Sequence, residues 1–237
     1  MKPVAIFRFS KTEHPGRFGA WLTSNGIPWQ LVPLDEGAPV PESPSAYSGI
    51  GMMGGPMSVN DKLPWIAPMC SLLRDAISDG TPVIGHCLGG QILARAAGGK
   101  VTANPVKEIG WNPVRVEDTP LARRWFGAGL AEFTTFQWHG ETFSIPPGAE
   151  RILTGRHCPN QAYVLGDRHL GLQCHVEMTP EMIASWIASG RSEIEANLAS
   201  PAVQPVERIT ADMRERLPAL SGYADRLYAR WVENLKR

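Results

Sequence analysis

One cysteine stands where an apolar segment gives way to a helix-forming one. Cys87 follows the apolar run 82–84 and precedes the helix-forming run 92–97, and Gly85 and Gly89 flank it at minus two and plus two. A strand that turns directly into a helix brings these flanking positions close together, so side chains there would collide and glycine is required. The pattern therefore favours a strained turn that exposes Cys87 as a nucleophile.

Two further features favour thiol chemistry at this position. A residue at a helix N-terminus lies near free backbone N–H groups and the positive end of the helix dipole, which both favour a thiolate. The N–H of the next residue, Leu88, would point at an oxyanion formed on the electrophile that Cys87 attacks. A buried structural cysteine in an ordinary strand-to-helix turn is the alternative interpretation of a lone Gly-x-Cys-x-Gly pattern.

A thiol nucleophile needs a base, and the base needs a group that orients it. His175 follows the apolar run 170–174 and precedes Glu177 by two residues. At a strand end this spacing can direct both side chains to one side, although a surface pair before a helix is the alternative. His139 is a rival base. We expect it to have a structural role or to line the substrate site instead, because its neighbour Glu141 is predicted in a turn-like stretch and not at a strand end.

The elements that must position these residues alternate between strands and helices in the first part of the chain. We expect strands over 4–9, 29–34, 47–53 and 82–84, and helices over 16–25, 64–79 and 92–97. Such alternation predicts an α/β domain with a mostly parallel sheet, whose active site lies beyond the carboxyl ends of the strands. Cys87 and the loop at 54–55 both fall at such ends.

The rest of the chain changes character. Segments 99–116, 132–143 and 151–174 are predicted as successive strands that form a small antiparallel insertion or edge. A helix with Thr179 as N-cap and Pro180 as its first residue is expected to end at Gly190.

Residues 201–237 are predicted as two more helices, for which we favour packing on the same domain over a homodimer or partner surface. The chain is therefore interpreted as a single domain, with a core of about residues 1–190 and a C-terminal helical extension of about 191–237.

Composition restricts the class of protein. The 23 basic and 23 acidic residues give no net charge, so nothing indicates a nucleic-acid partner. No signal peptide or membrane-spanning apolar run is evident in the sequence. The four cysteines form no Cys-x-x-Cys pair, which favours a reducing cytoplasm. No His/Cys/Asp cluster has the spacing of metal ligands, so we expect neither a metal nor a cofactor.

Three motifs resemble those of the class I (triad-type) glutamine amidotransferases. Residues 85–91, Gly-His-Cys-Leu-Gly-Gly-Gln, are similar to the nucleophile motif Gly-x-Cys-x-Gly-x-Gln. Residues 171–177 are similar to Gly-x-Gln-x-His-x-Glu, and Gly-Gly-Pro at 54–56 resembles the oxyanion loop. The motifs occur in the family's order, and the resemblance covers roughly residues 1–190. Within the family, 54–61 and 138–143 resemble stand-alone proteins related to the amidotransferase domain of GMP synthase.

The resemblance implies a flavodoxin-like three-layer α/β sandwich and a role for each motif residue. Cys87 is the implied nucleophile, His175 the base and Glu177 its orienting group, while the N–H groups of Gly55 and Leu88 form the oxyanion hole. The substrate, L-glutamine or a γ-glutamyl compound, is expected near Gly55, Leu88, Gln91, Trp138, His139 and Gly140.

Three positions depart from the family pattern. Cys174 stands where phenylalanine is frequent, Val176 stands where proline usually separates the catalytic histidine and glutamate, and Trp138 stands where several branches have asparagine or serine. None of these changes removes a reactive group, so the implied triad remains intact. Trp138 affects only the expected recognition of the substrate's α-groups.

The implied chemistry is hydrolysis of a side-chain amide with release of ammonia. Neither a Ser-Gly-Gly-x-Asp-Ser loop nor a Gly-x-x-x-x-Gly-Lys motif occurs in these 237 residues, so we expect no nucleotide amination by this chain alone. A separate synthetase would then receive the ammonia. Two alternatives stay open: a stand-alone γ-glutamyl peptidase or hydrolase, and a non-catalytic regulator that kept the fold.

Overall fold

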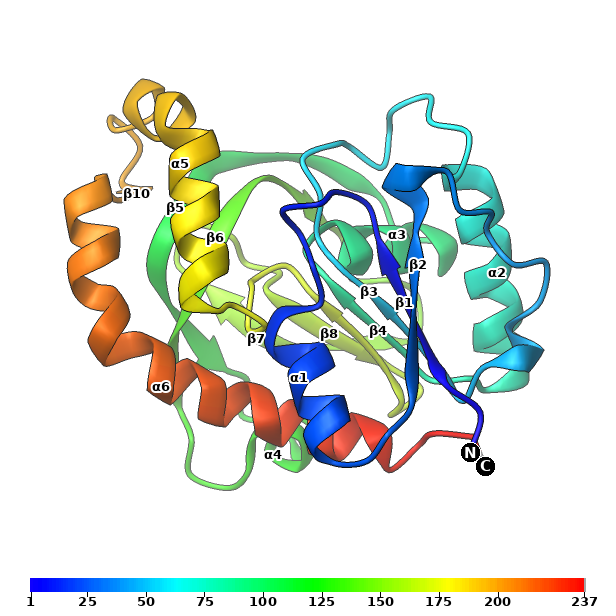
Figure 1. Ribbon diagram of the computed structural model, residues 1–237. Helices are drawn as coiled ribbons and strands as arrows, with labels where there is room; N and C mark the ends of the chain where they lie inside the picture. The colour runs from blue at the N-terminus through cyan, green and yellow to red at the C-terminus, as the bar shows by residue number, and fades with distance from the viewer. Residues whose placement is uncertain (237) are drawn as a thin grey trace.

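A ten-stranded sheet organises the computed structural model, which describes residues 1–236 (Figure 1). The strands are β1 (Val4–Arg8), β2 (Trp29–Pro33), β3 (Gly49–Met52), β4 (Val83–His86), β5 (Val101–Val116), β6 (Glu132–Phe143), β7 (Ala149–Gly155), β8 (Ala162–Leu165), β9 (His169–Leu172) and β10 (Ala202–Val203). The α-helices are α1 (Gly16–Ser24), α2 (Ile66–Asp79), α3 (Leu88–Ala96), α4 (Pro120–Phe126), α5 (Pro180–Ala196) and α6 (Val206–Val232). Two short 3₁₀ turns are η1 (Leu34–Glu36) and η2 (Pro44–Ala46).

The parallel part of the sheet runs in the order β2, β1, β3, β4 and β9. All residues of β3 and β4 are buried, as expected for parallel strands covered on both faces, and only His86 among them has a polar side chain. In the β4–β9 pair, His86 lies opposite Leu172. Because parallel strands end at the same edge, the segments that follow β4 and β9 emerge side by side, and these segments carry Cys87 and His175.

The predicted antiparallel strands continue the same sheet. β9 pairs with β8, β8 with β7, and β7 with β5, all antiparallel. β6 pairs with β5 off this path, and its observed bounds, 132–143, agree with those predicted. The expected insertion is therefore the second half of the central sheet, joined to the parallel half through β9.

Two hydrophobic cores lie on the two faces of the sheet, which confirms the predicted three-layer α/β arrangement. Along β1, Val4 and Ile6 join the core shared with α1, α5 and α6, whereas Ala5 and Phe7 join the core shared with α2 and α3. Figure 1 shows α2 and α3 on one side, and α1 and α6 on the other. Within residues 1–236, no helix has both the length and the apolar character needed to cross a membrane.

The helix predicted to end at Gly190 continues to Ala196, so that prediction was wrong. A Cβ atom on Gly190 would lie 2.3 Å from Cζ2 of Trp138. Gly190 thus admits the indole ring against the middle of α5 and does not end the helix. The boundary drawn at residue 190 consequently falls inside α5.

The tail also differs from the two helices predicted for 201–237. One long helix, α6, runs through Pro218, after the short strand β10, which pairs with β5. Ile209 before the proline and Leu220 after it are both fully buried, so packing of one apolar face outweighs the helix-breaking tendency of proline. Residue 237 lies outside the described residues.

Two glycines in the middle of helices should respond oppositely to alanine. Gly222 of α6 is exposed, with open space where a Cβ would lie, so Gly222→Ala should stabilise the protein by about 0.5–1 kcal/mol. Gly190→Ala should destabilise it by about 1–3 kcal/mol, because the methyl group displaces the Trp138 ring. Thermal unfolding followed by circular dichroism tests both. Equal stabilisation by the two variants would contradict the assigned Trp138 contact.

Candidate active site

The turn between β4 and α3 is as tight as the glycine spacing implied. Cys87 has φ 49° and ψ −107°, a strained backbone for a residue with a side chain. A Cβ on Gly85 would lie 2.4 Å from the backbone carbon of Gly89, and one on Gly90 would lie 2.4 Å from the Leu172 oxygen. The Cys87 N–H donates to that same oxygen at 2.8 Å. The glycines therefore let β9 and α3 close tightly around Cys87.

The implied base and its orienting group form a buried pair. The His175 Nδ1 atom lies 2.6 Å from Oε1 of Glu177, and both side chains are excluded from solvent. The His175 backbone N–H donates to the Phe136 oxygen of β6 at 2.9 Å. The ring of Trp186 meets the imidazole edge-on, with centroids 4.8 Å apart. These contacts determine the orientation of the ring, and Nε2 has no hydrogen-bond partner among residues 1–236.

Electrostatics makes this pair ionic. Burial lowers the pKa of His175, but the Glu177 carboxylate and the Cys87 thiol raise it more, so that the pKa lies well above its usual range. Burial raises the pKa of Glu177, but the neighbouring His175 lowers it to about 2. At neutral pH the pair is therefore an imidazolium and a carboxylate.

Gln173 is a site residue to which the sequence interpretation assigned no role. Its Nε2 group donates to the Cys87 sulfur at 3.5 Å, and its Oε1 atom accepts from Gln91 at 3.1 Å. Gln91 therefore orients the amide that contacts the thiol. The signal was present in the sequence, because Gln173 precedes His175 by two residues and an extended backbone directs such side chains to one side.

A cavity of about 550 Å³ opens beside the thiol. Besides Cys87 and His175, it is lined by five of the six residues expected to contact substrate, namely Gly55, Gln91, Trp138, His139 and Gly140. Leu88 is the exception, because its side chain is buried under the turn. The sequence interpretation missed several other lining residues, which are Thr12, Glu13, Lys107, Trp186 and Glu193.

The two expected oxyanion donors lie on adjoining segments. A Cβ on Gly55 would lie 2.8 Å from Cδ2 of Leu88, so the loop after β3 runs close to the start of α3. Leu88 is the first residue of α3, and a first-turn N–H has no acceptor within its own helix. A helix N-terminus of this kind can stabilise negative charge on a bound carbonyl oxygen.

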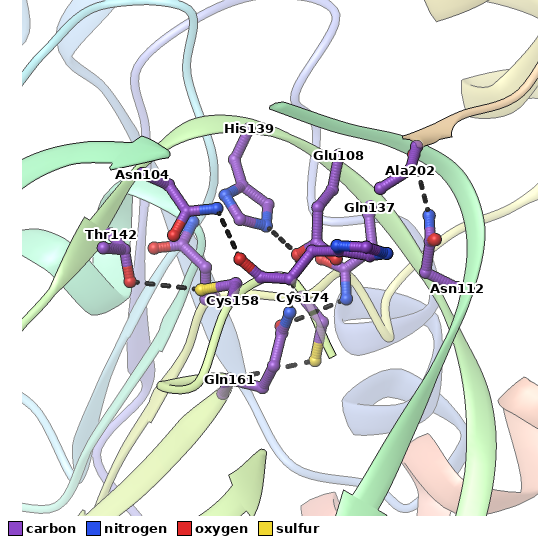
Figure 2. Close-up of polar contacts among 12 residues, drawn as sticks. Asn104, Glu108, Asn112, Gln137, His139, Thr142, Cys158, Gln161, Cys174 and Ala202 are labelled. Atoms are coloured by element: carbon purple, nitrogen blue, oxygen red, sulfur yellow. Dashed lines mark hydrogen bonds and ion pairs between the residues drawn. The ribbon is translucent and has the colours of Figure 1, made fainter. Parts of the chain in front are cut away.

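The surroundings of His139 differ from the prediction, because Glu141 lies within β6 and not in a turn. His139 Nδ1 lies 3.0 Å from the Glu141 backbone oxygen, and Nε2 lies 3.0 Å from Oε2 of Glu108, the residue opposite it on β5 (Figure 2). A backbone carbonyl only accepts, so Nδ1 donates. Nε2 pairs with the Glu108 carboxyl whichever of the two holds the proton. His139 therefore has no free lone pair with which to act as a base.

The same cluster contains the types of side chain that bind metals. Glu108, His139 and Cys158 bring their ligand atoms within 4.8 Å of one another, although they are far apart in sequence. The Glu108 oxygen also accepts from Gln161 at 2.8 Å, and the Cys158 sulfur lies 3.2 Å from the Thr142 hydroxyl (Figure 2). Burial raises the pKa of Cys158 to about 11, so it is a neutral thiol. We interpret this cluster as a hydrogen-bond network that supports β5 and β6.

Comparisons with known proteins agree with the motifs. The family model for class I glutamine amidotransferases matches residues 21–187. The fold is similar to the crystal structure of a glutamine amido transferase from Methylobacillus flagellatus, with TM-score 0.97 and 46% identity over 100% of this chain and 96% of that one. The glutamine amidotransferase-like protein YfeJ of Salmonella typhimurium is 26% identical over 77% of this chain and 78% of its own length.

Two other relatives have more specific names. A glutamine-hydrolysing GMP synthase from Paraburkholderia phytofirmans is 32% identical over 56% of this chain, and the match spans 26% of that longer protein. Gamma-glutamyl peptidase 3 of Arabidopsis thaliana is 25% identical over 74% of this chain and 74% of its own length.

Cys87 should be the first of the four cysteines to react with iodoacetamide near neutral pH. Burial raises the pKa of each of the other three thiols, which makes them less reactive. The pKa of Cys70 is raised, that of Cys158 is raised to about 11, and that of Cys174 is raised well above its usual range. Peptide mass spectrometry over time measures the order of labelling. Gln173→Leu, which removes a donor to the sulfur, should slow labelling of Cys87 about tenfold. Faster labelling of Cys158 or Cys174 than of Cys87 would contradict the assignment.

Proposed function

Because this chain belongs to the class I glutamine amidotransferase family, we propose that it is a cysteine-dependent glutaminase that releases ammonia from the side-chain amide of L-glutamine. One observation carries the proposal. The thiol at the strained Cys87 turn opens into the same cavity as His175, whose imidazole is held by a buried Glu177 at 2.6 Å. A nucleophile, a base and an orienting group in this arrangement are the requirements for acyl transfer.

In the first half-reaction, the Cys87 thiolate attacks the side-chain carbonyl carbon of glutamine. The N–H groups of Leu88 and Gly55 stabilise the negative charge that develops on the carbonyl oxygen. As the carbon–nitrogen bond breaks, the His175 imidazolium transfers its Nε2 proton to the departing nitrogen, which leaves as ammonia. The γ-glutamyl group remains on the sulfur as a thioester.

In the second half-reaction, His175 acts as a base. The neutral imidazole takes a proton from a water molecule, and the resulting hydroxide attacks the thioester carbonyl. The carbon–sulfur bond breaks, glutamate forms, and the Cys87 thiolate is restored beside the imidazolium. Glu177 stabilises the positive ring of the free enzyme, and its short hydrogen bond to Nδ1 keeps Nε2 available for each transfer.

We propose a separate acceptor enzyme for the ammonia. The GMP synthase relative is matched over 26% of its own length, and these 237 residues contain no Ser-Gly-Gly-x-Asp-Ser loop for nucleotide activation. The peptidase alternative is favoured by the similarity to Gamma-glutamyl peptidase 3 over 74% of both chains. The complete set of Cys87, His175 and Glu177 argues against a non-catalytic regulator. Steady-state kinetics on glutamine and on γ-glutamyl dipeptides separates the two enzymatic proposals.

Replacement of the nucleophile gives the first activity prediction. Cys87→Ser should lower kcat by at least about 10³-fold on glutamine and on γ-glutamyl substrates, while thermal unfolding stays close to that of the wild type. Ammonia release measured by a coupled assay reports the loss. Cys158→Ser, which changes a thiol outside the turn, is the matched control and should retain activity. More than a few per cent of wild-type turnover in Cys87→Ser would refute the nucleophile assignment.

Replacing His175, Glu177 and His139 in turn by glutamine should rank these residues by their effect on kcat. His175→Gln should lose about 10²–10⁴-fold in kcat, because His175 moves a proton in both half-reactions. Glu177→Gln should lose less, since it still accepts from Nδ1. His139→Gln should mainly raise KM, because an amide can still donate to Glu108. If His139→Gln lost kcat as severely as His175→Gln, the proposed base would be wrong.

A further inference from the structure

A buried carboxyl oxygen in the cavity has no partner in the protein. Glu13 lies between β1 and α1 and lines the same cavity as Cys87 and His175. Its Oε2 atom is buried, and no group within residues 1–236 forms a hydrogen bond to it. Burial raises the pKa of this carboxyl to about 7, although the nearby His175 imidazolium opposes the shift. An unpaired buried carboxyl costs free energy, so a bound ligand is the natural partner for it.

The Glu13 carboxyl lies close to the His175 ring. A Cβ on Gly54 would lie 2.5 Å from Oε2 of Glu13 and 3.2 Å from Cε1 of His175. Gly54 therefore leaves free the space where these two groups approach each other. Glu13, Cys87 and His175 line the same cavity, so a substrate amide held between the thiol and the imidazole would lie near the Glu13 oxygen.

Backbone contacts before and after Glu13 attach its segment to the residues around the base. The Thr12 backbone oxygen accepts a hydrogen bond from the Trp186 indole at 2.8 Å, and the Arg17 backbone N–H donates to the Glu177 backbone oxygen at 2.8 Å. Trp186 packs on His175, and Glu177 pairs with it. The loop that carries Glu13 is thus attached to the residues that orient the base.

The chemistry of the departing group indicates what Glu13 can bind. The nitrogen of a primary amide carries two hydrogens, one of which can be donated to a carboxylate while His175 supplies the proton for departure. In a γ-glutamyl amino acid, the same nitrogen bears a carbon with a carboxylate, which would bring a second negative charge to Glu13. Lys107, a cation that lines the cavity, is already paired with Glu193.

We propose that Glu13 is a specificity-determining residue that accepts a hydrogen bond from the departing nitrogen and selects primary amides over amides of α-amino acids. This inference rests on the proposed amide hydrolysis and names glutamine as its preferred substrate class. Glu13 takes no proton in the step. The carbon–nitrogen bond breaks, His175 protonates the nitrogen, and the ammonia that forms then breaks its hydrogen bond to the Glu13 carboxylate and leaves.

The test compares three substrates at about pH 8, where Glu13 is ionised. These are glutamine, γ-glutamylglycine and γ-glutamylethylamide, which replaces the carboxylate of the glycine compound by a methyl group. The wild type should prefer glutamine and should discriminate against γ-glutamylglycine relative to the ethylamide. Glu13→Gln should reduce the ratio of kcat/KM for γ-glutamylethylamide to kcat/KM for γ-glutamylglycine about tenfold or more. The same variant should lower kcat/KM for glutamine about tenfold.

Two further variants separate charge from structure. Glu13→Asp keeps the charge and should retain most of the discrimination, while Glu181→Gln changes an exposed carboxylate on α5 and should behave like the wild type. An active wild type whose ethylamide-to-glycine ratio is unchanged in Glu13→Gln would overturn this inference alone. A wild type inactive on all three substrates would overturn the proposed function as well.

Discussion

Close packing of backbone around Cys87 is the constraint on which the rest of the site depends. Gly85, Gly89 and Gly90 occupy places where a single Cβ would meet backbone atoms at 2.4–2.7 Å. The absence of a Cβ at these glycines lets α3 approach β3 and β9 closely. In the tight turn that results, Cys87 adopts a positive φ at the N-terminus of α3. The strain is tolerated because the surrounding sheet and helix determine the turn. The strained turn then directs the thiol toward the cavity, next to the segment that follows β9.

The second constraint is the ionic pair buried behind the thiol. Two charges removed from water are stable only when each has a well-placed partner. Glu177 meets His175 at 2.6 Å, the Trp186 ring restricts how the imidazole can turn, and the Phe136 carbonyl fixes the His175 backbone. In the proposed reaction, the imidazolium beside the sulfur supplies the proton for the departing nitrogen.

Local patterns were sufficient to predict the parts of the fold and site that depend on neighbours in sequence. The Cys87 turn was predicted from glycines two residues before and after the cysteine. The His175–Glu177 pair and the bounds of β6 were predicted from the alternation of side chains along an extended backbone. Contacts between distant segments could not be predicted in this way. Glu108 is 31 residues from His139, and Glu13 reaches the base from the opposite end of the chain. Gly190 likewise resembles a helix stop until Trp138 is seen to pack against it.

In the proposed reaction the γ-glutamyl group is transferred to the Cys87 sulfur, and this covalent intermediate can be trapped. The protein is mixed with isotopically labelled glutamine, quenched in acid during steady-state turnover, digested and analysed by mass spectrometry. We expect a labelled γ-glutamyl thioester on the peptide that carries Cys87, and hydroxylamine should remove this label. Ammonia release without any label on Cys87, or label on Cys70, Cys158 or Cys174 instead, would contradict it.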